Sequence, residues 1–168
     1  DLVVVGAWGN ADAGDDSGSA YVFARTTNDG TTWSETAKLV ASDAAEGDFF
    51  GESVAVGGDL VVVGAYGNAD AGRDSGSAYV FRTTNGGASW TQVAKLVASD
   101  AAAFDYFGTS VAAAGDYSGS AGHRTTMTPA TTRARPTSYV FRTTNGGASW
   151  TQVAKLLASD AAEYTAPP

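Results

Sequence analysis

Two acidic loops carry residue types that could bind a metal ion. Oxygen-bearing side chains alternate along both loops in the pattern Asn-x-Asp-x-Gly-x-Asp, with candidate ligands at Asn10, Asp12, Asp16, Asn68, Asp70 and Asp74. Alternating oxygen ligands around a glycine suit a hard cation such as Ca²⁺. The same residue types also form turns without a metal, because Asn and Asp side chains bond to nearby backbone amides. Two hypotheses therefore stay open for these loops, a Ca²⁺ site and plain turn chemistry.

Residues suited to catalysis do not gather in one motif. Glycoside hydrolysis needs two convergent carboxyl groups, or a Tyr nucleophile with a partner Glu. The four Glu residues are scattered along the chain, at Glu35, Glu46, Glu52 and Glu163. The single His, His123, stands in a segment without a strand signal, so a Ser–His–Asp arrangement has no credible base. The sequence predicts a protein that is not an enzyme.

Composition excludes several classes of function. The 168 residues have a formal net charge of −8 and no Cys. This charge argues against nucleic acid as a partner, because phosphates require a basic patch. Disulfides are excluded, and no apolar run approaches the roughly 18 residues of a membrane span. The chain opens on DLVVVGA, which is the middle of a repeat, so we expect a fragment without a signal peptide.

An internal repeat organises the whole chain. Asp1 and Asp59 begin matching stretches 58 residues apart, and Tyr79 and Tyr139 occupy equivalent positions 60 residues apart. A fixed period indicates one supersecondary unit whose copies bury their faces on one another. The middle copy predicts four strands, at 53–56, 60–65, 77–82 and 90–97. The second of these is apolar at nearly every position, as expected of a strand buried on both faces. Four-stranded units at regular spacing indicate the blades of a β-propeller.

Short motifs carry a family resemblance. Phe50-Gly51 and Phe107-Gly108 precede the first strand of a unit, and Val5-Gly6-Ala7 and Val63-Gly64-Ala65 end the second. This pattern resembles the FG-GAP repeats of integrin α-subunit β-propellers and their microbial and algal relatives. A second pattern, Thr83-x-Asn85-x-Gly87-x-Ser89-Trp90, recurs at 26–33 and 143–150 and resembles the Asp-box hairpins of sialidase-type propellers. In this pattern the Asn side chain is expected to cap turn amides.

We expect an all-β fold, a partial β-propeller of about three four-stranded antiparallel blades in a single repeat array. Blade one covers 1–41 and lacks its first strand, blade two covers 51–98, and blade three covers 108–158 before a tail at 159–168. An irregular, mobile insert at 117–137 should deprive blade three of its second strand. A shifted reading frame or a basic surface insertion would explain this insert. Closed propellers use about 4–8 blades, so further blades or self-association should be needed.

Alternating strand directions place the longer loops on one face. The loop after the second strand of a blade should emerge beside the connection between blades, and both are acidic and aromatic. The candidate ligand residues on this face are Trp8, Tyr66, Asp43, Asp48, Asp100 and Asp105. Trp8 and Tyr66 could stack on a sugar or anchor a protein, or could pack at the rim. Lys38, Lys95 and Lys155 recur on the fourth strand, where we expect solvated edge charges.

The resemblance implies a non-enzymatic recognition or adhesion module, outside the cell or on its surface, with a protein or glycan ligand. Two alternatives stay open. One is a fragment of a sialidase-like glycoside hydrolase whose catalytic residues lie elsewhere, and the other is a purely structural repeat array.

Overall fold

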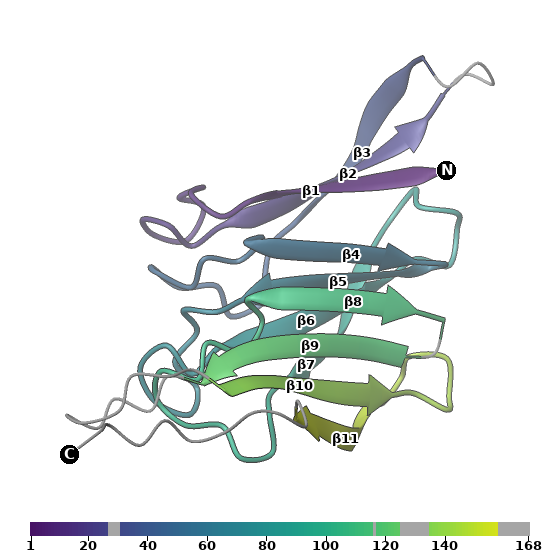
Figure 1. Ribbon diagram of the computed structural model, residues 1–168. Coiled ribbons are helices and arrows are strands. Elements are labelled where there is room, and N and C mark those ends of the chain that lie inside the picture. The colour runs from purple at the N-terminus through teal and green to yellow at the C-terminus, as the bar shows by residue number, and fades with distance from the viewer. Residues whose placement is uncertain (27–30, 116, 125–134, 158–168) are drawn as a thin grey trace, which may run out of the picture.

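The computed structural model describes residues 1–26, 31–115, 117–124 and 135–157. These residues form three antiparallel sheets, which lie beside one another in Figure 1. The blade-one sheet has three strands in the order β1-β2-β3, and the other two sheets have four strands each in sequence order. The strands are β1 (Leu2–Ala7), β2 (Ser19–Arg25), β3 (Trp33–Leu39), β4 (Ser53–Gly57), β5 (Leu60–Ala65), β6 (Ser77–Arg82), β7 (Thr91–Leu96), β8 (Ser110–Ala114), β9 (Tyr117–Arg124), β10 (Arg135–Arg142) and β11 (Thr151–Leu157).

Blade two confirms the four strands expected from the sequence. The hairpin between β4 and β5 pairs Gly57 with Leu60, and Gly58 at its tip has φ 64°, a conformation that glycine adopts without steric cost. All six residues of β5 are buried, as the unbroken apolar run predicts. The strand order β4-β5-β6-β7 follows from hairpin connections between neighbours. The predicted all-β blade architecture is therefore present.

Two apolar clusters hold the blades together, one on each side of blade two. Val61 and Val63 are fully buried and belong to the cluster shared with blade one, which includes Val22 and Leu39. Val62, between them in sequence, belongs to the cluster shared with blade three. Alternate residues of one strand therefore pack on opposite neighbours. The full burial of β5 on both faces is the consequence.

Glycines allow the backbones of successive blades to touch. A Cβ on Gly64 would lie 1.9 Å from the carbonyl oxygen of Gly108, and a Cβ on Gly6 would lie 1.8 Å from that of Gly51. In both cases the glycine of the Val-Gly-Ala motif meets the glycine of the following Phe-Gly motif. Only glycine fits at such a close approach. The two short motifs are thus the two sides of one contact, repeated at each blade junction.

The prediction of an irregular insert at 117–137 is wrong for the residues that the structure describes. Strand β9 fills the place of the second strand in blade three, paired with β8 over Ser110–Ala114 and with β10 along its whole length. Strand pairing is made by backbone groups, so β8 and β10 can hold a segment that lacks an apolar pattern. The remainder of the predicted insert, residues 125–134, lies outside the described residues, as does the tail at 159–168.

Candidate functional site

The longer loops do share one face, as the sequence predicts. In blade one, the amides of Gly47 and Phe49 donate to the carbonyl oxygens of Asp15 and Asp16, both at 2.9 Å. The next junction repeats this contact, with the amides of Phe104 and Tyr106 donating to the carbonyl oxygens of Arg73 and Asp74 at 2.8 and 2.9 Å. Each blade-to-blade connection is therefore bonded to the loop of the blade before it. We call this surface the long-loop face.

An aromatic row crosses the long-loop face from blade one to the second junction. The ring centroids of Trp8 and Phe49 are 5.9 Å apart, and Phe49 stacks on Tyr66 at 4.9 Å with the rings nearly parallel. Tyr66 is 6.1 Å from Tyr106, which is 6.3 Å from Phe104. Trp8 is 48 % exposed, and the other four rings are half-buried. Trp8 and Tyr66, predicted on this face, are thus brought together with three rings that the sequence analysis did not assign to it.

Three residues of the aromatic row have strained backbone conformations. Phe49, Phe104 and Tyr106 have φ values of 54°, 64° and 53°, in the left-handed region that non-glycine residues avoid at a cost of about 1–2 kcal/mol each. The loop-to-loop hydrogen bonds of the same residues hold them there. Left-handed backbone of this kind clusters at functional sites. The backbone that carries these three rings is consequently held in one conformation, which limits the backbone entropy lost when a ligand binds.

Carboxylates surround the row. Burial raises the pKa of the Tyr66 hydroxyl, and the nearby charges of Glu52 and Asp74 raise it further. Arg73 shows how a cation fits here, since its guanidinium carbon lies 5.9 Å from the centre of the Phe104 ring and its Nε lies 3.4 Å from an oxygen of Asp74. The Arg73 side chain is 81 % exposed. An aromatic surface with carboxylates at its edge favours arginine- or lysine-containing ligands.

Two of the predicted ligand residues are structural. Asp48 and Asp105 are only 4 % and 8 % exposed. Their carboxylates accept hydrogen bonds from the amides of Ala45 and Ala102, at 3.0 and 2.8 Å. These bonds cap the turns in which the residues stand. Both carboxylates lie beneath the surface in this structure, and their contact with a ligand stays a prediction.

Asp43 and Asp100 are exposed but bound to the fourth strand of the following blade. Asp43 accepts from the ammonium of Lys95 at 2.6 Å, and Asp100 accepts from the Tyr139 hydroxyl at 2.9 Å and from Lys155. The ammonium groups of Lys95 and Lys155 also lie 5.3 and 5.4 Å from the ring centres of Tyr79 and Tyr139. Lys95 and Lys155 are therefore not the solvated edge charges that the sequence predicts. Each ties its blade to the connection before it.

The candidate cation loops are held by bonds within the chain. Asn10 donates to the Tyr21 hydroxyl at 2.7 Å, and its carbonyl oxygen accepts from the Gly18 amide at 2.8 Å. In the second copy the Gly76 amide donates to the Asn68 carbonyl at 2.8 Å, and the Ser77 hydroxyl donates to the Asn68 side chain at 3.0 Å. The side-chain-to-backbone bond of the turn hypothesis is made in the second loop, where the Asn68 side-chain oxygen accepts from the Asp70 amide at 3.4 Å.

The acidic members of these loops face different partners. Asp12 is bonded to Lys38 at 2.5 Å, and Asp70 is paired with Lys95. Asp16 and Asp74 adopt positive φ at the start of the contact between loops. Among the described residues, no three His, Cys, Asp or Glu side chains form a group that could hold a metal ion. Ca²⁺ binding by these loops stays a prediction.

The lysine contacts predict a loss of stability in acid. The hydrogen bond from Lys38 lowers the pKa of Asp12, and that from Lys155 lowers the pKa of Asp100. At Asp43 burial acts to raise the pKa, but the bonds from Lys95 and Tyr79 outweigh it and the net pKa is lowered. A carboxyl group with a lowered pKa binds fewer protons folded than unfolded, so its stabilisation is present above its ordinary pKa of 3.8 and is lost as pH falls further. Asp48 acts oppositely, because burial raises its pKa.

Three carboxyl groups have a lowered pKa (Asp12, Asp43 and Asp100) and one, Asp48, has a raised pKa. The urea concentration at the midpoint of unfolding is therefore expected to fall when pH drops from about 6 to about 3. Urea unfolding followed by Trp fluorescence measures it. Asp100→Asn should show a smaller drop than the parent chain. A midpoint that stays constant or rises in acid would be inconsistent with these pairings.

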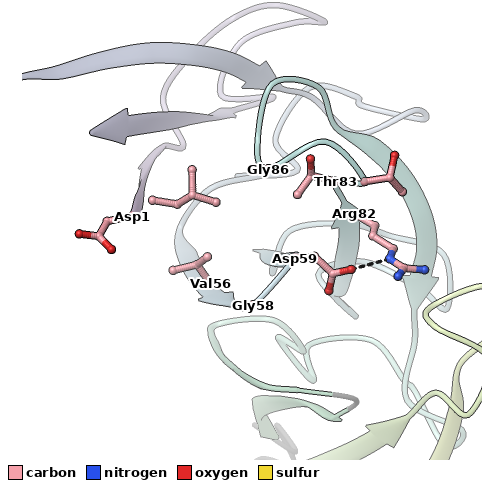
Figure 2. A pocket seen from close by; sticks show the side chains of 9 residues that line it. Asp1, Val56, Gly58, Asp59, Arg82, Thr83 and Gly86 are labelled. Atoms are coloured by element: carbon pink, nitrogen blue, oxygen red, sulfur yellow. Dashed lines mark hydrogen bonds and ion pairs between the residues drawn. The ribbon is translucent and has the colours of Figure 1, made fainter. Parts of the chain in front are cut away.

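A hollow of about 700 Å³ lies on the opposite face, where blade one meets blade two. Figure 2 shows Asp59 and Arg82 in it, joined by an ion pair of 2.8 Å. Arg82 also donates to the carbonyl oxygen of Gly146. The Arg82 guanidinium is thus already paired with a carboxylate of its own blade and with a carbonyl oxygen of the next hairpin. These contacts argue against its binding an anion.

The hairpins on this face are closed by the Asn side chains, as predicted. The Asn85 side-chain oxygen accepts from the Ser89 amide at 2.9 Å, and Asn145 accepts from Ser149 at the same distance. The corresponding Asn28 lies outside the described residues. The face opposite the long loops is therefore built of short, internally bonded turns.

Comparison with known proteins identifies the family. The family model of the FG-GAP repeat matches residues 1–23, 33–81 and 90–118. The chain belongs to the FG-GAP repeat family. FG-GAP repeats are typically non-enzymatic, and together with the propeller-like fold they indicate a repeat-based binding module. No helix long and apolar enough to cross a membrane occurs in the part of this FG-GAP protein that the structure describes.

A solved structure has a similar fold. Sqt1 of Saccharomyces cerevisiae is similar with a TM-score of 0.52 at 10% identity. The match covers 95% of this FG-GAP chain and 33% of Sqt1, so the chain spans about a third of the length of that protein. At this identity the likeness shows the fold alone, a partial β-propeller. A search of curated proteins finds no relative of this chain.

Proposed function

We propose that this FG-GAP chain is a non-enzymatic recognition module, acting outside the cell or on its surface, that binds a cationic segment of a protein partner. The aromatic row of the long-loop face carries the proposal. Five rings contact one another in a row across this face. With Trp8 48 % exposed, the row offers a surface on which a ligand can stack. The typical occurrence of FG-GAP repeats in extracellular proteins supports the location.

Charge supports a basic ligand over a neutral one. The net charge of the chain is −8. At the row itself, burial and the negative charges of Glu52, Asp74 and Asp16 raise the pKa of the Tyr66 hydroxyl. A guanidinium stacked on a partly desolvated aromatic ring gains about 1–2 kcal/mol. A carboxylate at the edge of the ring adds a charge-assisted hydrogen bond. The contact of Arg73 with Phe104 and Asp74 is an example of this chemistry within the chain.

The test is a titration with a peptide of alternating arginine and glycine, with the citrulline version of the same peptide as the uncharged control. We expect saturable binding of the arginine peptide only. Trp8→Ala and Tyr66→Ala should each weaken it about tenfold, the equivalent of one lost cation–π contact. Trp33→Ala is the matched control, since Trp33 is 38 % exposed and stands outside the row.

Either of two results would contradict the proposal. Equal binding of the citrulline peptide would show that charge is not recognised. Binding of a neutral oligosaccharide, with no response to the arginine peptide, would support the glycan alternative instead. Circular dichroism of each variant establishes that the blades remain folded.

A further inference from the structure

Two hairpins on the face opposite the long loops contain an Asn-Gly pair. Asn85-Gly86 stands between β6 and β7, and Asn145-Gly146 stands between β10 and β11. Both pairs belong to the same repeated stretch, TTNGGASWTQVAK, at 83–95 and 143–155. The other Asn residues of the chain are followed by Ala or Asp, at Asn10, Asn28 and Asn68.

An Asn that precedes Gly is chemically the Asn most prone to deamidation. The backbone nitrogen of the glycine attacks the side-chain carbonyl carbon (Cγ) of the Asn, and a C–N bond forms. The side-chain nitrogen leaves as ammonia, taking the proton of the glycine amide. Water then opens the five-membered succinimide ring, which leaves an aspartate or an isoaspartate. Glycine favours the attack because it has no Cβ beside the reacting nitrogen, and water is the one co-reactant needed.

Both pairs are accessible to water. Asn85, Gly86, Asn145 and Gly146 are all exposed. Gly86 has φ 71°, and a Cβ there would meet nothing within 4 Å. The tip of the first hairpin is therefore open to solvent, and no neighbouring residue covers the reacting atoms.

Hydrogen bonds hold each Asn side chain in the closed hairpin. The Asn85 side-chain oxygen accepts from the Ser89 amide and the Thr83 hydroxyl, both at 2.9 Å, and its nitrogen donates to the Ser89 hydroxyl at 2.8 Å. Asn145 makes the same three bonds with Ser149 and Thr143 at the same distances. Rotation of the side chain toward the nitrogen of the following glycine would break these bonds.

We propose that Asn85 and Asn145 are sites of spontaneous deamidation, and that the closed hairpin holds the reaction back. The rate at each site is then the rate in an unfolded chain multiplied by the fraction of time that its hairpin is open. The modification sites lie on the face opposite the aromatic row, so they are independent of the proposed ligand.

An aspartate formed at either site fits the closed hairpin. The Asn85 side chain contacts the Ser89 amide, the Ser89 hydroxyl and the Thr83 hydroxyl, and a carboxylate can accept from all three, since a hydroxyl can turn from acceptor to donor. Asn85→Asp should therefore keep the urea midpoint of the parent chain at neutral pH. A clearly lower midpoint would overturn this part of the proposal.

Peptide mapping of the full chain measures the reaction. The folded chain and the same chain unfolded in urea are kept at mildly alkaline pH, and mass spectrometry of tryptic peptides follows the conversion of amide to carboxyl. Trypsin cuts after Arg and Lys, so both hairpins of the parent release the same peptide, TTNGGASWTQVAK. In urea this peptide should react well before the peptides that contain Asn10 and Asn68. In the folded chain its reaction should be at least about tenfold slower, because the hydrogen bonds must first break.

Ser89→Ala tests the hairpin, with the second hairpin of the same molecule as its matched control. The variant removes the acceptor of the Asn85 side-chain nitrogen and gives the two tryptic peptides different masses. In the folded chain, deamidation at Asn85 should become about two- to tenfold faster, as expected for one lost hydrogen bond, while Asn145 keeps its parent rate. Rates in urea correct for any direct effect of the substitution. Ser149→Ala should reverse the pattern.

Gly86→Ala tests the attacking group. In urea it should slow deamidation at Asn85 to the rate at Asn10, which is also followed by Ala. An unchanged rate would overturn the proposed reaction. Equal rates in the folded chain and in urea would show that the hairpin gives no protection. An Asn85 rate that Ser89→Ala leaves unchanged, or that rises together with the rate at Asn145, would also overturn the proposal, because the hairpin bonds would then not control the reaction.

Discussion

Gly76→Ala is expected to prevent folding, or to lower the free energy of unfolding by more than about 3 kcal/mol. Gly76 has φ 79°, and a Cβ there would lie 2.0 Å from the carbonyl oxygen and 2.4 Å from the amide nitrogen of Phe107. These are backbone atoms of the next blade junction, held by a bridge between Gly76 and Phe107. Backbone cannot rotate away as a flexible side chain does. The substitution therefore forces the second and third blades apart.

Gly86→Ala is the matched control. Gly86 has a similar φ of 71°, but a Cβ there meets nothing within 4 Å. Only the conformational penalty remains, about 1–2 kcal/mol. Urea denaturation of the two variants measures the difference. Equal destabilisation would mean that the close approach of the two backbones does not hold the blades, contrary to the structure.

Phe107→Ala is expected to lower the free energy of unfolding by about 3–5 kcal/mol. The ring is 1 % exposed and meets Tyr139 and Phe141 edge-on, with centroids 5.6 and 6.0 Å away. Its loss leaves a cavity between blades two and three and removes two aromatic contacts. The effect should appear as a lower denaturation midpoint without loss of strand content at pH 7.

Phe104→Ala provides the comparison at the same junction. Phe104 is half-buried and stands at the end of the aromatic row, so its removal leaves a surface and not a closed cavity. We expect a loss of about 1 kcal/mol. If Phe104→Ala destabilised the chain as much as Phe107→Ala, the assignment of Phe107 to the core and of Phe104 to the surface would be untenable.

The sequence predicts the blade architecture well because its signals are local. The apolar run at Leu60–Ala65 and the glycines of the turn before it specify a doubly buried strand after a hairpin, and the structure places both there. Strand β9 was missed for the opposite reason. Nothing in Tyr117–Arg124 alternates between apolar and polar, and the strand exists through its backbone bonds to β8 and β10. Backbone bonds of this kind leave no mark in the residue pattern of β9 itself.

The candidate site was predicted in outline and revised in detail. Strand alternation places the long loops on one face, but it does not reveal which acidic side chains lie beneath the surface, as Asp48 does. Nor does it show that Phe49 and Tyr106 adopt positive φ, which turns their rings toward Tyr66. One signal was available, since both residues directly precede a Phe-Gly pair. The repeat therefore marks Phe49 and Tyr106 as equivalent positions, each an aromatic residue beside a buried Phe.

The most direct test of a recognition face is to map where the arginine peptide binds, using backbone amide chemical shifts. We predict changes at Gly9, Gly67 and Asp74, around the aromatic row, and none at Gly58 and Gly86, which line the hollow of the opposite face. Shifts confined to Gly58 and Gly86 would place the ligand in that hollow. They would contradict the assignment of recognition to the long-loop face.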